Sequence, residues 1–389
     1  MAMFRARARG TANSALILLL AVLGCGFAAL PAGAKIRSLS KLAVIGDSYS
    51  DAGNSGLLNQ ASGFPVFPSP YYADGRFTNG SAAVERLWAR FNPSLPALRP
   101  SQMAGGTNYA VGGATSGLDS YFNVAIDMPD QLRPVYDNSS AKGQLTRLLS
   151  AFTPGSFDPS STLFVYWMGP NDGLYWLTTN KTPGNVSTNT GPVQANAFEM
   201  LQNSKDNIET GLQLLINNGA RHLLVPNLMD FGKAPAFSGD PSQAAAVTAL
   251  SLGFNQKLDQ VLVDLRLSNP GVDIMGFNTY GLFEKIFTAP DRYGFSNKVD
   301  ACTSIYDPTT FAPGCSQVAS DWLFWDGVHV TSAAHQVIAD SMYQTVYEAP
   351  GPLPVAGGVV ALGWGRRLRQ RLRQRRRQPQ RSRWRPGAA

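Results

Sequence analysis

The sequence is poor in the residues that bind metals and carry redox chemistry. It has only three histidines and three cysteines among 389 residues. No two cysteines are spaced as a CxxC pair, the arrangement found in many small zinc sites and in thioredoxin-like redox sites. The sequence therefore offers no metal or redox motif of that kind, and it offers few candidates for a catalytic base.

The sequence also lacks an internal repeat and a phosphate loop. Its glycine-rich stretch GGTNYAVGGATSG (105–117) is missing the lysine and hydroxyl residue that complete a phosphate loop. A nucleotide-binding module is therefore disfavoured.

The excess of positive charge belongs to the two ends of the chain. The 33 Lys and Arg residues outnumber the 26 Asp and Glu residues, which gives a formal net charge of +7. Three arginines precede residue 35 and eleven follow residue 365, so the segment between them has 19 basic and 26 acidic residues, a net charge of −7. A basic surface for nucleic acid is not predicted there, and we exclude nucleic acid as a partner.

Residues 1–34 have the three parts of a secretory signal peptide. A short arginine-containing start precedes the apolar run ALILLLAVLGCGFAAL, and Ala32-Gly33-Ala34 is a small-x-small cleavage site. Lipoprotein processing at Cys25 is the alternative, but apolar residues continue beyond that cysteine. We expect an exported protein, located in the periplasm, at the cell surface or outside the cell.

Residues 348–389 form a separate C-terminal segment. A Pro/Gly linker leads to the apolar run Val355 to Trp364, about half the ~20 residues needed to cross a bilayer, and then to an arginine cluster. This order resembles the PEP-CTERM sorting signals that exosortases remove, although GPLP (351–354) lacks the glutamate of the namesake motif. The alternative is a basic tail that binds nucleic acid or anionic lipid. We expect transient membrane association through this segment and an exosortase-type sorting protease as a partner.

Residues 35–347 alternate short apolar runs with helical patterns. Helical patterns cover 195–217, 242–267 and 332–347. The alternation predicts one α/β domain with a parallel sheet and helices on both faces. The apolar runs have the composition of strands buried on both faces, and they are KLAVIGD (41–47), TLFVYWMG (162–169), RHLLVPNL (221–228) and VDIMGFN (272–278).

Two cysteines, Cys302 and Cys315, remain once the signal peptide is removed. An even number of cysteines in an exported chain indicates a disulfide. We expect one bridge that closes a short loop.

The first of these apolar runs ends in a small polar corner, VIGDSYSDAGN (44–54), which leaves Ser48 at the mouth of a strand. Ligands bind at the carboxyl ends of strands in open α/β sheets, so Ser48 is a candidate nucleophile, although such residues also form ordinary turns. A nucleophilic serine needs a base, and His329 follows Asp326 by three residues in WDGVH (325–329). The carboxylate can orient the imidazole, and we predict a triad of these three residues.

Several neighbouring polar residues are expected to have structural roles. His222 opens a core strand and His335 lies within the last helix. Near the candidate nucleophile, Asp47 is interpreted as a loop brace, and Asp51 and Ser50 are interpreted as helix caps. Asp172 in the block GPND is interpreted as a second loop brace.

Two further stretches supply donors for the negative charge that develops on oxygen during acyl transfer. GGTNYAVGGATSG places Gly112 and Gly113 after an apolar segment, where bare backbone can approach a reacting carbonyl. YWMGPND (166–172) ends another strand with Asn171, whose amide can point into the same crevice.

Four blocks in order along the chain resemble the signatures of the GDSL or SGNH hydrolases: GDSYSDAGN, NYAVGGAT, GPND and WDGVH. YYADGRFTNGSAAVERL (71–87) resembles the Gly-Arg-Phe-Ser-Asn-Gly segment of the lipase-like branch, and LLVPNLMDFGKAP (223–235) resembles a later strand and loop of that branch. The resemblance spans residues 42–347.

The resemblance implies a flavodoxin-like three-layer α/β/α sandwich with no metal or organic cofactor. It implies that Ser48 is the nucleophile and that Asp326 and His329 complete the triad. It assigns the oxyanion hole to the backbone N–H of Ser48, to Gly113 and to Asn171, with Gly112 as the alternative glycine. Tyr49 stands where the namesake has leucine, a departure that touches no catalytic role.

These features predict an exported serine ester hydrolase of the lipase or esterase type, which acts through an acyl-enzyme on an ester of a lipid or short acyl chain. A carbohydrate O-acetylesterase acting on surface polysaccharide is an alternative, because the aromatic loop FPVFPSPYY (64–72) suits either an acyl pocket or a sugar. A non-catalytic surface protein on the same fold is a second alternative.

Overall fold

The computed structural model of the protein describes residues 39–63, 71–91, 93, 94, 96–125, 128, 130–152, 157–304 and 310–348. The predicted signal peptide and, apart from Glu348, the predicted C-terminal segment lie outside these residues. Within the described part of the chain, no helix combines the length and apolar character that crossing a membrane requires.

Four parallel strands form the central sheet, and each falls within an apolar run that the sequence singled out. In spatial order they are β1 (Lys41–Gly46), β2 (Thr162–Trp167), β3 (His222–Pro226) and β4 (Asp273–Phe277). Every residue of β2 is buried, as expected for a parallel strand covered on both faces.

A short extended segment lies along the other side of β1. The N–H of Val44 donates to the carbonyl of Thr107 at 3.0 Å, and the N–H of Tyr109 donates to the carbonyl of Val44 at 2.9 Å. After β1, the chain therefore first adds the segment at 107–109 on one side of β1 and later adds β2 on the other side. This reversal is the topological switch point at which open α/β sheets form their ligand crevice, and it lies at the carboxyl end of β1.

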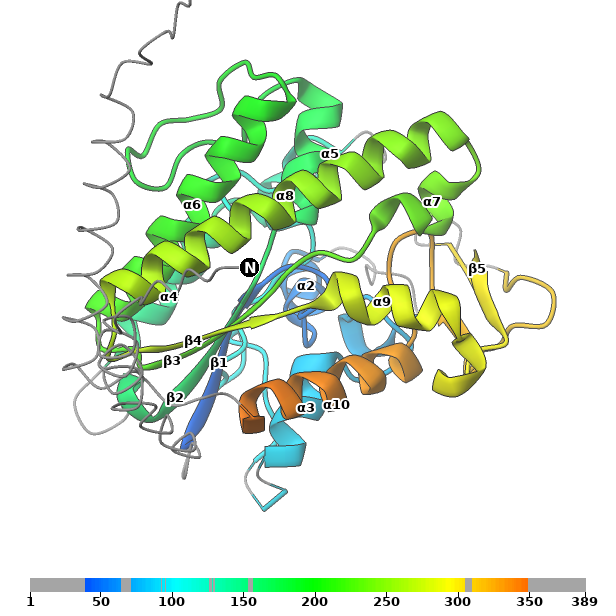
Figure 1. The fold of residues 1–389 in the computed structure, drawn as a ribbon, viewed down its shortest axis with the longest axis horizontal. Helices are drawn as coiled ribbons and strands as arrows, with labels where there is room; N and C mark the ends of the chain where they lie inside the picture. The colour runs from blue at the N-terminus through cyan, green and yellow to red at the C-terminus, as the bar shows by residue number, and fades with distance from the viewer. Residues whose placement is uncertain are drawn as a thin grey trace, which may run out of the picture.

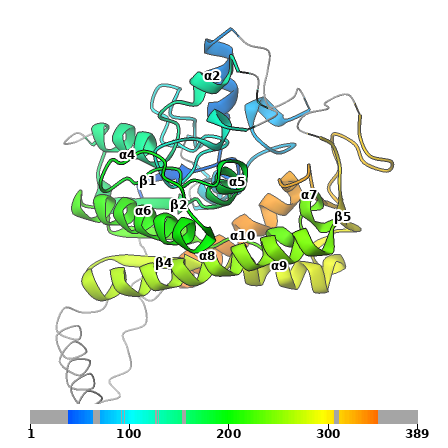
Figure 2. The ribbon, with the colours of Figure 1, turned by 90° about the horizontal axis from the view of Figure 1, so that it is seen from above.

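Helices cover both faces of the sheet, which confirms the predicted three-layer sandwich (Figure 1). One layer consists of α4 (Ala141–Ser150), α6 (Ala197–Asn217) and α8 (Pro241–Ser268), which lie side by side over the strands in the view from above (Figure 2). The opposite layer contains α3 (Ala83–Phe91) and α10 (Ser332–Glu348), which pack against each other. The remaining helices are α2 (Asn54–Ala61), α5 (Pro170–Thr179), α7 (Pro235–Ser238) and α9 (Thr279–Thr288), with 3-10 turns at Ala73–Gly75, Tyr121–Asn123, Arg133–Tyr136, Pro159–Ser161, Phe231–Lys233 and Pro290–Tyr293.

The two long helices begin where capping side chains satisfy their first N–H groups. Asn196 accepts a hydrogen bond from the N–H of Glu199, whose carboxylate accepts one from the N–H of Asn196, so α6 starts with a capping box. Asp240 accepts from the second and third residues of α8, whose first residue is Pro241. The predicted helices at 195–217 and 242–267 are confirmed within two residues.

A second, smaller sheet was not predicted. Its two parallel strands are β5 (Asn297–Ala301) and β6 (Trp322–Phe324). The predicted pair Cys302 and Cys315 forms a disulfide directly after β5, with Cα atoms 5.5 Å apart. The buried Cys302 packs in a cluster with Trp322 and Trp325, so the bridge supports the end of β6.

Candidate active site

The candidate nucleophile lies in a tight turn directly after β1. The carbonyl of Asp47 accepts a hydrogen bond from the N–H of Ser50 at 3.0 Å, and its Oδ1 accepts one from the N–H of Tyr49 at 3.0 Å. A Cβ on Gly46 would lie 2.9 Å from the Cβ of Ser50, so this turn requires glycine there. The expected loop-bracing contact of Asp47 is present, and Ser48 stands at the carboxyl end of the strand.

The candidate acid-base pair lies in a hairpin turn that follows β6. The N–H of Trp325 donates to the carbonyl of His329 at 2.8 Å and closes the turn. Asp326 Oδ1 accepts hydrogen bonds from the N–H groups of Val328 (2.8 Å) and His329 (2.7 Å). The backbone of the block WDGVH thus fixes the carboxylate relative to the imidazole.

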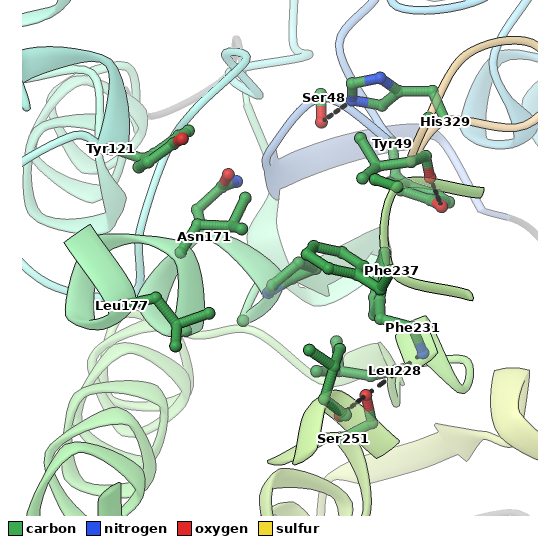
Figure 3. A pocket seen from close by; sticks show the side chains of 18 of the residues that line it. Ser48, Tyr49, Tyr121, Asn171, Leu177, Leu228, Phe231, Phe237, Ser251 and His329 are labelled. Atoms are coloured by element: carbon green, nitrogen blue, oxygen red, sulfur yellow. Dashed lines mark hydrogen bonds between the residues drawn. The ribbon is translucent and has the colours of Figure 1, made fainter. Parts of the chain in front are cut away.

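The structure brings Ser48, His329 and Asp326 into one hydrogen-bonded chain, of which Figure 3 shows the bond between Ser48 and His329. Ser48 Oγ lies 2.7 Å from His329 Nε2, and His329 Nδ1 lies 2.7 Å from Asp326 Oδ2. An ionised carboxylate can only accept, so Nδ1 carries the proton and Nε2 accepts the hydroxyl hydrogen of the serine. This is the arrangement of a nucleophile, a general base and an orienting carboxylate.

Asp326 is buried, and burial by itself would raise the pKa of its carboxyl group. The charge of His329 and the hydrogen bonds from His329, Tyr72 and Val328 outweigh that effect, and the pKa of Asp326 is lowered from its ordinary value. The carboxylate is therefore ionised and can stabilise an imidazolium.

The two candidate glycines differ in what their N–H groups do. The N–H of Gly112 donates to Asp51 Oδ2 and to Ser55 Oγ, both at 3.0 Å. In the described part of the chain, no acceptor is bonded to the N–H of Gly113 or of Ser48. Gly113 has a φ of +74°, and a Cβ there would lie 2.6 Å from the ring of Phe122. The geometry favours Gly113 as the oxyanion donor, because Gly112 is already occupied.

Asn171 lies in the first turn of α5, beside the same crevice (Figure 3). One hydrogen of its Nδ2 is donated to the carbonyl of Ala114 at 3.0 Å, which leaves the second available to a ligand. The next residue, Asp172, accepts hydrogen bonds from the N–H (2.7 Å) and hydroxyl (2.5 Å) of Ser116. Its expected role as a loop brace is consistent with these contacts.

The expected capping roles in the first block are confirmed for one residue and wrong for the other. Asp51 accepts hydrogen bonds from the N–H groups of Gly53 (2.8 Å), Asn54 (2.6 Å) and Ser55 (3.2 Å) at the start of α2. The hydroxyl of Ser50 is buried and has no hydrogen-bond partner among the described residues. The Ser50 hydroxyl therefore caps none of the described helices.

The other two histidines have structural surroundings, as expected. His222 Nδ1 lies 3.0 Å from Asp273 Oδ2 on the neighbouring strand β4. His335 is buried in α10, and its Nδ1 accepts a hydrogen bond from the N–H of Ala83. Burial, with smaller contributions from Arg86 and His329, lowers the pKa of His335 to about 3, so this imidazole stays neutral.

A cavity of about 570 Å³ opens beside Ser48 (Figure 3). Ser48 and His329 stand at one end, and Leu177, Leu228 and Ser251 lie at the other end in the figure. Most of the lining is aliphatic or aromatic, and it comes from α5, α6, α8 and the segment around α7. The apolar members of the lining include Phe122, Leu174, Leu177, Met200, Leu201, Leu228, Phe231, Phe237, Val247, Leu250 and Phe254.

Comparison with known proteins shows the family of the chain. The model of the GDSL-like lipase/acylhydrolase family matches residues 42–342. The chain belongs to this family. It is 25% identical to a GDSL esterase/lipase of Arabidopsis thaliana over 81% of this chain and 88% of that protein. It is 26% identical to a thermolabile hemolysin of Vibrio parahaemolyticus over 79% of this chain and 64% of that protein.

As a member of the GDSL-like family, the protein is a hydrolase of the lipase or esterase type. A solved extracellular lipase from Streptomyces rimosus covers 78% of this chain and 99% of its own, with 13% identity and a TM-score of 0.34, a similarity too weak to bear on function.

Sequence reasoning missed three side chains that hold the site of this GDSL-like hydrolase. Tyr72 donates its hydroxyl to Asp326 Oδ2 at 2.6 Å. Tyr49 donates its hydroxyl to the carbonyl of Val328 at 2.6 Å. Gln144, buried in α4, bonds both the N–H and the carbonyl of Gly46 and so fixes the end of β1. The two tyrosines lie inside quoted motifs, but no spacing rule reveals where their hydroxyls point.

Two buried carboxyl groups near the nucleophile have raised pKa values. Burial raises the pKa of Asp47 to about 7, and the nearby Asp172 and Asp51 add to this while its hydrogen bond from Tyr49 and the charge of His329 oppose it. Burial likewise raises the pKa of Asp51 to about 6, against hydrogen bonds from Ser55, Gly53 and Gly112. Asp47 Oδ2 is buried without a partner among the described residues.

These shifts make stability depend on pH. Because the folded-state pKa of Asp47 lies above its ordinary value of 3.8, the native state binds more protons than the unfolded state up to about pH 7. The free energy of unfolding should fall as pH rises through that window. In Asp47→Asn this fall should be smaller, by on the order of 1 to 3 kcal/mol, when urea unfolding is compared at pH 5 and pH 8. Equal pH dependence in the variant and the wild type would contradict the assignment.

Proposed function

We propose that the protein is an exported serine ester hydrolase that cleaves carboxylic esters of lipids or of medium-length acyl chains. One observation carries this proposal: Ser48 Oγ is hydrogen-bonded to His329 Nε2, with Asp326 behind it, at the end of an apolar cavity. Ser48 attacks the ester carbonyl while His329 takes the hydroxyl proton. His329 then gives that proton to the leaving alcohol, and water, activated by the same imidazole, releases the acid from the acyl-enzyme.

The donors beside Ser48 suit the tetrahedral intermediate of this reaction. The N–H groups of Ser48 and Gly113 have no other acceptor among the described residues, and Asn171 keeps one amide hydrogen. Asn171 also sits at the N-terminus of α5, where the helix dipole favours negative charge. Three such donors would stabilise an oxyanion that forms beside Ser48.

The cavity favours an acyl chain over a sugar. Leucine, phenylalanine, methionine and valine side chains dominate its walls, and Ser48 and His329 stand at one end. An alkyl chain gains stability by leaving water for such a surface, at about 0.8 kcal/mol per methylene. The acetyl group of a polysaccharide ester would leave most of the cavity empty, so the O-acetylesterase alternative has less support.

Export is supported by the signal-peptide pattern of residues 1–34 and by the disulfide between Cys302 and Cys315. The C-terminal apolar run and arginine cluster would then serve as a sorting signal that holds the chain at the membrane until an exosortase-type protease removes it. Both ends lie outside the residues that the structure describes.

The triad can be tested with a fluorophosphonate probe and a chromogenic ester. Ser48→Ala and His329→Ala should lower ester hydrolysis by several orders of magnitude, because members of a triad act as a unit. Asn171→Ala should cost about 100- to 1000-fold in turnover. His222→Gln, which alters a histidine outside the site, serves as the control and should keep most of the activity. Failure of the wild-type protein to react with the probe would support the non-catalytic alternative instead.

The hypothesis that the cavity holds the acyl chain of the substrate can be tested at Gly173, which lies on α5 and lines the cavity. A Cβ added there would meet no atom within 4 Å, so a side chain at this position starts in open space. Gly173→Leu should lower kcat/KM for an octanoate ester at least about 10-fold relative to an acetate ester. Gly271→Leu, at an equally open glycine outside the cavity, should leave that ratio unchanged. An unchanged ratio in Gly173→Leu would mean that the acyl chain lies elsewhere.

Export can be tested by intact-mass analysis of protein released by its native host. The mature chain should begin near Lys35, lack the arginine cluster and contain no free thiol. Retention of the complete tail on exported protein would rule out the sorting signal, and two alkylatable thiols would rule out the bridge.

A further inference from the structure

We propose that Tyr72 is a positioning residue for the acid-base pair: its hydroxyl holds the carboxylate of Asp326 in the orientation that His329 needs. This inference rests on the proposed function and deepens it. Tyr72 donates to Asp326 Oδ2 at 2.6 Å, the same oxygen that lies 2.7 Å from His329 Nδ1. The carboxylate therefore has a donor on Oδ2 besides the imidazole.

The rest of the carboxylate is also fully engaged. Asp326 Oδ1 accepts the N–H groups of Val328 and His329, both from its own turn. Those two bonds hold the carboxylate within the hairpin, whereas the bond from Tyr72 ties it to a segment 254 residues away in sequence. Tyr72 thus ties the carboxylate of the hairpin to the segment at 71–78, as Tyr49 ties the backbone of the hairpin at Val328 to the nucleophile turn.

Burial and an aromatic contact fix the position of the Tyr72 ring. It is buried and meets the ring of Trp325 edge-on, with centroids 6.0 Å apart. Trp325 directly precedes Asp326, and its carbonyl accepts the N–H of Thr303 at 2.8 Å. Tyr72, Trp325 and the disulfide-bonded Cys302 belong to one buried cluster.

The segment that carries Tyr72 is anchored from its other side. Ala73 donates its N–H to the carbonyl of Thr78 at 2.9 Å. Arg76 Nε and Nη2 form a two-pronged ion pair with Glu85 on α3, at 2.9 and 2.8 Å. The motif GRFTNG therefore has a physical task here, which is to hold the preceding tyrosine in place.

Removing only the hydroxyl should loosen the carboxylate and make Oδ2 a stronger acceptor for the imidazole. A buried charged group that loses a donor moves or recruits another partner, so the base would be less well oriented. A carboxylate with one donor fewer also stabilises a neighbouring positive charge more strongly. Activity that needs neutral His329 should then require a higher pH.

Other titratable groups surround this pair and must be considered in any pH profile. Asp47 and Tyr49 approach His329 and Asp326 from the nucleophile turn. His335 approaches from α10, with Arg86 of α3 behind it. The Tyr72→Phe substitution replaces none of these residues, so variant and wild type differ in chemistry only by the Tyr72 hydroxyl.

The test compares wild type, Tyr72→Phe and Tyr175→Phe on one medium-chain ester from pH 5 to pH 9. Tyr175→Phe is the matched control, because Tyr175 is also buried and donates its hydroxyl to a carboxylate, that of Asp119 at 3.2 Å, outside the site. Tyr72→Phe should lower kcat on the order of 10-fold with KM unchanged, since Tyr72 does not line the cavity. The acidic half of its profile should move to higher pH, whereas the control should match the wild type.

A double-mutant cycle separates positioning from packing. In an Asp326→Asn background the charged acceptor is gone, so adding Tyr72→Phe should change kcat less than about 2-fold. Full additivity of the two substitutions, a kcat loss with no change in the pH profile, or an equal loss in Tyr175→Phe would each overturn the proposal.

A readout that needs no substrate keeps this test apart from that of the proposed function. With only three histidines in the chain, 15N-histidine signals can be assigned with His222→Gln and His335→Gln. The His329 imidazole should titrate at higher pH in Tyr72→Phe than in the wild type. An unchanged titration overturns the role of Tyr72, whereas a shifted titration in a protein that hydrolyses no ester supports that role and contradicts only the proposed function.

Discussion

The hydrogen bond between Ser48 and His329 joins residues 281 positions apart, and much of the architecture serves to make it possible. Ser48 is placed by β1, which is held between β2 and the segment at 107–111. His329 is placed by the hairpin after β6, a strand that pairs with β5. The two halves of the site therefore come from two different sheets, and their separation is set by the contacts between those sheets rather than by any local motif.

Several carboxylates around the site are buried, which is costly unless each group finds a partner. Asp51 takes five hydrogen bonds, including one from the N–H of Gly112, so a helix cap and a glycine loop share one carboxylate. Asp326 and Asp172 are satisfied in the same way. Asp47 is the exception, since one of its oxygens has no partner in the described part of the chain. Burial raises the pKa of Asp47, as it does that of the hydrogen-bonded Asp51 and Asp172.

Much of the fold could be predicted because its signals are local. The four strands of the main sheet are apolar runs ended by turn residues, and the long helices carry their own caps. The residues of the candidate site could be named because their blocks stand in a recognisable order. Local signals could not predict β5 and β6, since β5 has an exposed, polar composition and depends on its partner strand and on the disulfide.

Finer details of the site depended on three-dimensional contacts. Gly113 is favoured over Gly112 because the N–H of Gly112 already has an acceptor, and that acceptor is a carboxylate 61 residues away. The error at Ser50 has a similar cause: serine is a favoured capping residue, but here Asp51 accepts the N–H groups of Gly53, Asn54 and Ser55, and the Ser50 hydroxyl is buried without a partner among the described residues. The hydroxyl partners of Tyr49 and Tyr72 lie more than 250 residues away.

Tyr49 shows how the polar and apolar halves of the site meet. Its ring lines the cavity and packs 5.8 Å from the ring of His329, while its hydroxyl donates to the carbonyl of Val328. Burial, together with the charges of Asp326 and Asp47, raises the pKa of Tyr49 well above its ordinary value, so the hydroxyl stays protonated and keeps donating. A leucine at this position could supply the apolar wall but not the hydrogen bond. Tyrosine supplies both, which ties the shape of the cavity directly to the position of the imidazole.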